Sequence, residues 1–136
     1  MFTHHAKIYL RDTDATGVLF FGEQLRLALE AFESFLMTRG INLSKIIEEA
    51  DFLFPVVHVE ADFFVSLRAG DSIEIILFAA RIGTSSFTLD ALFYNQEKVH
   101  VGKTRIVHVA TARGTKRSTP IPLPLLNVLQ ELVQAE

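Results

Sequence analysis

Cysteine is absent from this sequence of 136 residues. Its absence excludes disulfide bonds, thiolate metal sites and a cysteine nucleophile, and it agrees with a reducing compartment, so we expect a cytoplasmic protein. No apolar run approaches the roughly 20 residues that a membrane-spanning helix needs. The segment from Met1 to His5 lacks the basic region and apolar run of a signal peptide. We therefore predict no association with a membrane.

A large net charge and common enzyme motifs are also lacking. The formal net charge of −3 gives no general attraction for nucleic acid. No Gly-x-Ser-x-Gly segment supports a serine nucleophile, and no glycine-rich phosphate or dinucleotide loop is present. His100 and His108 share one face of a predicted strand, but they lie roughly 26 Å apart at about 3.3 Å per residue. We therefore expect neither a metal ion nor a cofactor.

Apolar residues, in contrast, are plentiful: 49% of the chain is hydrophobic, and twelve residues are Phe. This is enough for the core of one domain, which we predict over residues 1–136. Five segments alternate between apolar and polar residues with the period of two that is typical of strands. They are residues 2–11, 56–67, 73–83, 87–93 and 99–112, with a bulge or close approach expected at Gly102.

One predicted helix is much longer than the others, from Gly22 to about Arg39, with Gly40 as its stop. Its apolar residues recur at three- and four-residue spacing and form one stripe. They are Leu25, Ala28, Leu29, Phe32, Phe35 and Leu36. A short helix or a turn is predicted over residues 43–50, and a C-terminal helix over residues 125–134. Short connections between the last four strands predict antiparallel pairing, and only the long helix is able to cover the sheet. The predicted class is α+β, with a sheet curled round the helix as one of several layouts.

Two carboxylates and a glycine, Asp12, Asp14 and Gly17, stand directly before the long helix. A helix N-terminus carries unsatisfied N–H groups and partial positive charge, so it can bind an anion or a developing oxyanion. The structural alternative is a capping loop, because Asp and Thr cap helices and Gly permits a tight turn. Spacing alone leaves both interpretations open.

The segment from Asp12 to Phe21 resembles the motif Asp-x-Asp-x-x-Gly-Val-hydrophobic-aromatic of hotdog-fold thioesterases of the 4-hydroxybenzoyl-CoA thioesterase type. Residues 51–64 and the pair Gly70-Asp71 resemble the second strand of the 1,4-dihydroxy-2-naphthoyl-CoA thioesterases. The resemblance covers nearly the whole chain. It implies a hotdog fold, in which an antiparallel sheet of about five strands wraps round one long central helix.

Catalytic roles follow from the same resemblance. Hydrolysis of a thioester requires an activated water or a nucleophile, and a group that stabilises the charge on the carbonyl oxygen. The family's catalytic carboxylate corresponds to Asp14, and its oxyanion donor to the backbone N–H of Phe21, with Gly17 shaping the turn. Whether Asp14 acts as a nucleophile, through a mixed anhydride, or as a general base on water stays open. We interpret Asp12 as a structural residue, and Phe20 stands where the family usually has Tyr.

Substrate contacts are predicted further along the chain. The histidine of the dihydroxynaphthoyl-CoA branch corresponds to His58, which would hydrogen-bond a substrate phenol; alternatively, it packs at a subunit contact. Basic loop residues suit the phosphates of coenzyme A, unless they are merely solvated, and two serines are assigned to the pantetheine path. The predicted binding residues are His58, Ser85, Ser86, Arg113, Lys116 and Arg117.

The resemblance thus implies an acyl-CoA thioesterase for an aromatic substrate, with 1,4-dihydroxy-2-naphthoyl-CoA as a candidate and coenzyme A as part of the substrate. One alternative is a thioesterase for short or medium aliphatic acyl-CoA or for acyl carrier protein. Another is a non-catalytic hotdog domain that binds acyl-CoA. Sites between subunits in this family imply a homodimer or a homotetramer.

Overall fold

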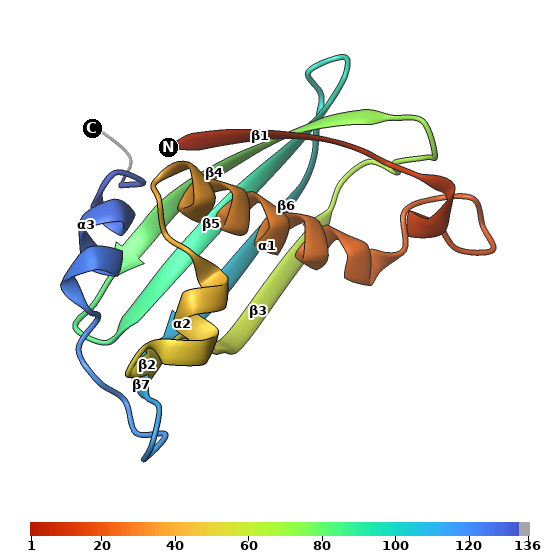
Figure 1. Cartoon of the computed structure of the whole chain (residues 1–136). Helices are drawn as coiled ribbons and strands as arrows, with labels where there is room; N and C mark the ends of the chain where they lie inside the picture. Colours follow the sequence, from red (N-terminus) through yellow and green to blue (C-terminus); the bar gives the residue numbers. More distant parts are fainter. Residues whose placement is uncertain (134–136) are drawn as a thin grey trace.

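The centre of the protein is one antiparallel sheet with a long helix packed on one of its faces (Figure 1). The structure, a computed structural model, describes residues 1–133. The strands follow the order β1-β4-β5-β6-β3 across the sheet. The bounds are β1 Phe2–Lys7, β3 Val56–Phe63, β4 Ser72–Ile82, β5 Ser86–Asn95, β6 His100–Val109 and α1 Phe21–Thr38. The predicted α+β class and the antiparallel pairing are confirmed.

Smaller elements complete the fold. They are the 3₁₀-helix η1 Leu10–Asp12, the helices α2 Leu43–Glu49 and α3 Leu123–Gln130, and the paired strands β2 Phe52–Leu53 and β7 Thr111–Ala112. Residues 43–50, predicted as a short helix or a turn, form the helix α2. The C-terminal helix starts two residues earlier than predicted, since proline is tolerated in a first helical turn. Its predicted end at residue 134 lies outside the described residues.

The first strand is shorter than predicted, because it ends at Lys7 instead of continuing to residue 11. Asp12 explains the difference, since its carboxylate accepts a hydrogen bond from the backbone N–H of Tyr9 and turns the chain into η1. The alternation over residues 2–11 places Leu10 on the same side as Ala6 and Ile8, which predicts that it is buried, but it is 78% exposed. That part of the sequence prediction is wrong.

The buried face of α1 is rotated from the predicted stripe. Ala28, Phe32, Phe35 and Leu36 are buried as predicted, whereas Leu25 and Leu29 are only half-buried. Three further residues, which the stripe did not include, are buried: Gln24, Leu27 and Ala31. The helix has apolar residues around much of its circumference, so spacing alone does not identify the side that meets the sheet.

An aromatic cluster surrounds His108 beneath the C-terminal half of α1. The imidazole is 3% exposed, stacks on Phe87 at a centroid distance of 4.9 Å, and lies between Phe32 and Phe54. Its Nδ1 donates a hydrogen bond of 2.9 Å to the carbonyl of Phe54. Burial lowers the pKa of His108, because a charged imidazolium loses its hydration there.

Strand β3 forms one edge of the sheet, beside β6 (Figure 1). Its apolar side chains are poorly covered, with Val57, Val59 and Phe63 between 44% and 57% exposed. The alternation over residues 56–67 is typical of a strand with one buried face, but only Ala61 within it is even half-buried. No helix in residues 1–133 has the length and apolar character required to cross a membrane.

Candidate active site

Asp12 anchors the loop that precedes α1. Its side chain is 3% exposed and accepts hydrogen bonds from the N–H of Tyr9 at 2.9 Å and from Nη2 of Arg26 at 3.2 Å. Its backbone carbonyl accepts a hydrogen bond of 2.9 Å from the N–H of Phe20. Both ends of the loop are therefore tied to one residue, which gives Asp12 a structural role.

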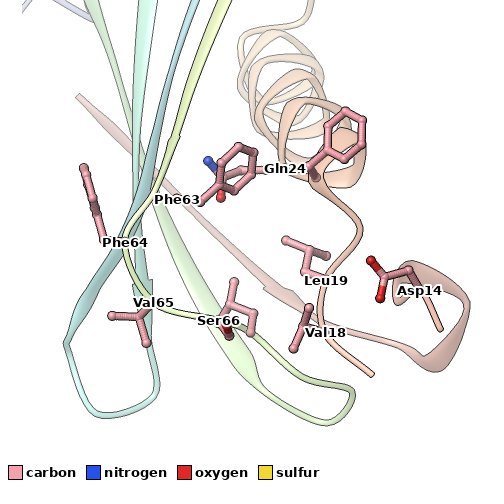
Figure 2. Close-up of a pocket in the computed structure, with 10 residues that line it drawn as sticks. Asp14, Val18, Leu19, Gln24, Phe63, Phe64, Val65 and Ser66 are labelled. Atoms are coloured by element: carbon pink, nitrogen blue, oxygen red, sulfur yellow. The ribbon is translucent and has the colours of Figure 1, made fainter. Parts of the chain in front are cut away.

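Gly17 closes the tight turn at the tip of this loop. Its φ of +82° lies in the left-handed region, which glycine adopts without steric cost. Its N–H donates to the carbonyl of Asp14 at 3.0 Å, and the N–H of Asp14 donates to the carbonyl of Val18 at the same distance. The turn places the carboxylate of Asp14 on the side of the loop that faces the sheet edge (Figure 2).

The carboxylate of Asp14 is exposed and held from one side. Its Oδ1 accepts hydrogen bonds from the backbone N–H and the hydroxyl of Thr16, while Oδ2 accepts none from residues 1–133. These two bonds, the hydroxyl first, lower the pKa of Asp14. The group is therefore an ionised carboxylate at neutral pH, with one oxygen available to a reactant.

Asp14 lines a cavity of about 260 Å³ between the loop before α1 and the chain that follows β3 (Figure 2). Most of the lining residues are apolar. They are Asp14, Val18, Leu19, Phe21, Gln24, Phe63, Phe64, Val65, Ser66 and Leu67. A hydrogen bond of 2.7 Å from the N–H of Leu19 to the carbonyl of Leu67 joins the two walls. An apolar group placed here would lie beside a single carboxylate.

The first turn of α1 borders the same cavity. Phe20 provides no side-chain cap for the helix, and the N–H groups of Phe21 and Gly22 donate no hydrogen bond to the described part of the chain. Such groups carry the partial positive charge of the helix N-terminus. A cavity with a carboxylate on one side and helix amides on another has the two components that hydrolysis of a thioester requires.

The predicted binding residues lie elsewhere in the chain. His58 pairs with Val107, whereas Phe63 at the cavity pairs with Gly102, so the two positions are roughly 16 Å apart along β3. Ser85 and Ser86 stand at the far end of β5, where Ser86 pairs with Val109. One chain therefore brings Asp14, Gly17 and Phe21 together without His58 or either serine.

Arg113, in the basic loop, has a structural role. Nε of Arg113 donates to the carbonyl of Ala50, and its Nη2 to the carbonyls of Ile46 and Ile47, each at 2.6 Å. The guanidinium thus satisfies the C-terminal carbonyls of α2, where positive charge is stabilising. Lys116 and Arg117 are exposed on the loop.

No cluster in residues 1–133 has three or more side chains suited to a metal ion.

Gln24 is a buried polar residue at this site that the sequence analysis missed. It is 1% exposed, lines the cavity, and donates from Nε2 to the carbonyls of Asp62 at 3.0 Å and Lys103 at 3.3 Å. A close approach of another group to the backbone was predicted at Gly102. The group that approaches it is the side chain of Gln24. A polar residue next to the apolar face of the predicted helix was the signal in the sequence that could have indicated this role.

The geometry agrees with the comparison to known families. Residues 8–133 match the family model of the Thioesterase-like superfamily. The chain belongs to this superfamily. It is therefore a thioester hydrolase, an acyl-CoA thioesterase, and the motif around Asp14 lies within the matched residues.

Individual members of the thioesterase-like superfamily are similar to this chain over nearly their whole length. It is 30% identical to 1,4-dihydroxy-2-naphthoyl-CoA hydrolase of Synechocystis sp., over 96% of both chains. It is 33% identical to the hydrolase of that name from Microcystis aeruginosa, over 95% of this chain and 93% of the relative. The crystal structure of a 1,4-dihydroxy-2-naphthoyl-CoA thioesterase from Synechocystis superimposes with a TM-score of 0.91, at 30% identity over 96% of each chain. The hotdog fold implied by the sequence is confirmed.

Proposed function

We propose that this thioesterase hydrolyses an aromatic acyl-CoA to the free acid and coenzyme A, with 1,4-dihydroxy-2-naphthoyl-CoA as the first substrate to test. Relatives named for that activity are about one-third identical to the chain over nearly its full length. The observation that carries the proposal is the shared cavity, in which the Asp14 carboxylate and the Phe21 end of α1 border a mostly apolar space. The chain acts as one hotdog domain, and a cytoplasmic location stays a prediction.

In the proposed reaction, the thioester carbonyl oxygen lies at the N–H of Phe21, and Asp14 lies near the carbonyl carbon. As a nucleophile, Asp14 forms a mixed anhydride while the thiolate of coenzyme A leaves, and water then cleaves the anhydride. As a general base, Asp14 takes a proton from water while the water oxygen attacks the carbonyl carbon, and the C–S bond then breaks with departure of the coenzyme A thiolate. The lowered pKa keeps Asp14 ionised at neutral pH, which both routes require.

A second subunit would complete the site. The edge of β3 exposes backbone groups and apolar side chains, which pairing with another chain would cover. If two β3 strands pair antiparallel about a two-fold axis, the N-terminal half of one strand lies beside the C-terminal half of the other. The partner subunit's His58 would then approach the cavity next to Phe63, where it would bind a substrate phenol. A homodimer, or a homotetramer of two such dimers, is accordingly proposed.

The coenzyme A moiety would extend away from the cavity over the surface. Lys116 and Arg117 are exposed and are proposed to bind its phosphates. Arg113 already holds α2, so its contribution to phosphate binding is expected to be small. Ser85 and Ser86 are proposed to line the pantetheine path from the second subunit.

The test is the rate of hydrolysis of a panel of aryl and alkyl CoA thioesters, measured by release of the coenzyme A thiol. We expect the highest kcat/KM for an aryl thioester. Higher kcat/KM for alkyl thioesters would overturn the aromatic substrate in favour of an aliphatic acyl-CoA. Absence of hydrolysis across the panel, with acyl-CoA still bound, would identify a binding domain.

A further inference from the structure

Gln24 connects α1 to two strands at the bottom of the Asp14 cavity. Its Nε2 donates to the carbonyl of Asp62 in β3 and to that of Lys103 in β6, and the residue is 1% exposed. Figure 2 shows its side chain extending from the first turn of the helix toward the strand that carries Phe63. Gln24 therefore fills the space between the helix and the sheet edge.

The fit of Gln24 against β6 leaves no gap. A Cβ added to Gly102 would lie 2.5 Å from Oε1 of Gln24, 2.9 Å from its Nε2 and 3.0 Å from the carbonyl of Asp62. These distances are well below van der Waals contact, so the amide occupies the space that any other residue at position 102 would need. A ligand in the Asp14 cavity cannot pass between Gln24 and β6 unless the side chain moves.

A second, internal cavity lies further along the same helix and strand. Ala28 is one helical turn further along α1, Thr104 is two residues beyond Gly102 on β6, and both line this cavity. Its volume of about 10 Å³ is enough for at most one water molecule. Two buried polar atoms on its wall, Oγ1 of Thr104 and Nε2 of His108, have no hydrogen-bond partner in residues 1–133.

We propose that Gln24 is the floor of the acyl pocket and sets the length of the acyl group that the thioesterase accepts. The proposal rests on the proposed function in so far as it places the acyl group in the Asp14 cavity. The volume of the Gln24 side chain ends that cavity, and its two hydrogen bonds hold the amide in place. Shortening the side chain extends the cavity toward Ala28 and Thr104.

The experiment compares Gln24→Ala with Gln24→Met, which has nearly the volume of glutamine but no amide. Affinity is measured by calorimetry for non-hydrolysable S-alkyl-CoA thioethers from butyl to dodecyl, and kcat/KM for the corresponding thioesters. In Gln24→Ala the preferred chain is longer by two or three carbons, with a gain of about fourfold per added methylene, which corresponds to ~0.8 kcal/mol each. Gln24→Met keeps the preference of the native protein.

Two further variants complete the comparison. Gln24→Asn shortens the side chain by one methylene and keeps the amide, so its preferred chain lengthens by less than in Gln24→Ala; it also serves if Gln24→Ala fails to fold. Leu27→Ala is the matched control, because Leu27 is buried on the same helix but lines neither cavity. Its loss of packing leaves the preferred length unchanged.

An unchanged length preference in both Gln24→Ala and Gln24→Asn would overturn the proposal. Equal shifts in Gln24→Met and Gln24→Ala would also overturn it, because the hydrogen bonds would then matter more than the volume. A shift in Leu27→Ala of the same size would reduce the effect to general loosening of α1. Thioether binding keeps this test separate from the proposed function, which fails if the native protein hydrolyses no thioester.

Discussion

Asp12 and Asp14 are two residues apart in one loop, yet their surroundings are opposite. The Asp12 side chain is 3% exposed, and each of its oxygens accepts a hydrogen bond, from Tyr9 N–H and from Arg26. Asp14 is exposed, and both of its hydrogen bonds come from Thr16 to the same oxygen. A carboxylate with both oxygens engaged holds the loop, whereas one with a remaining oxygen at a cavity is available for chemistry.

The largest expected effect comes from removing the charge of the exposed carboxylate. Asp14→Asn should lower kcat by roughly 10²- to 10⁴-fold, because an amide is neither a nucleophile nor a base. Its melting temperature should stay close to that of the native protein, since the contacts of Asp14 are confined to the loop. Thioester hydrolysis and thermal unfolding measure the two quantities. Native kcat in this variant would show that another group performs the reaction.

Asp12→Ala should show the reverse pattern. Removing its carboxylate leaves the N–H of Tyr9 and the guanidinium of Arg26 without their acceptor, at a cost of about 1–2 kcal/mol in the free energy of unfolding. Urea denaturation measures the loss. Asp12→Asn is the matched control, because an amide oxygen still accepts the bond from Tyr9 and should retain part of the stability. Unchanged stability in Asp12→Ala would contradict the anchoring role.

Arg26→Met tests the same anchor by removing the guanidinium that pairs with Asp12. The Arg26 side chain is 43% exposed and also pairs with Glu23 and Glu30, so water screens its interaction with Asp12. The expected loss of stability is below about 1 kcal/mol and therefore smaller than that of Asp12→Ala. Denaturation in the same buffer allows a direct comparison. A loss as large as in Asp12→Ala would mean that the ion pair, and not the Tyr9 bond, anchors the loop.

The smallest expected effect is a change in the pH profile of Asp14. The Thr16 hydroxyl lowers the pKa of Asp14, so Thr16→Val, which keeps the backbone bond, should raise that pKa toward its ordinary value. Because the reaction uses the ionised form, the acid limb of kcat/KM moves to higher pH, while the rate at neutral pH changes little. Thr16→Ser retains a hydroxyl and should keep the native profile. A shift of the limb to lower pH would contradict the assignment of Asp14.

The sequence predicted the elements that bury one face within the chain. Strands β4 and β5 are interior strands with one face against α1, so alternation of apolar residues identifies both. Residues 56–67 show the same alternation, but β3 lies at the edge of the sheet and both of its faces are largely exposed. The position of Asp14 before a helix was visible in the motif, and its role came from the family resemblance.

Contacts between distant segments were beyond a sequence-based prediction. Arg113 was expected at a phosphate, but its guanidinium binds carbonyls of α2 more than sixty residues earlier in the chain. Gln24 was not assigned to either side of α1, although Gly102 provides a space for it on β6. Both contacts depend on how the elements pack, and periodicity within one element carries no information about that.

The buried imidazole of His108 makes acid inactivation a process with two separable causes. The unfolded chain gains a proton on this residue at about pH 6.5, the ordinary histidine value, whereas the folded chain resists it until the lowered pKa is reached. Stability therefore declines as the pH falls through this interval. The pKa of Asp14 is lowered, so its carboxylate is still ionised in this interval, and a loss of activity there that coincides with unfolding is assigned to His108 and not to titration of Asp14.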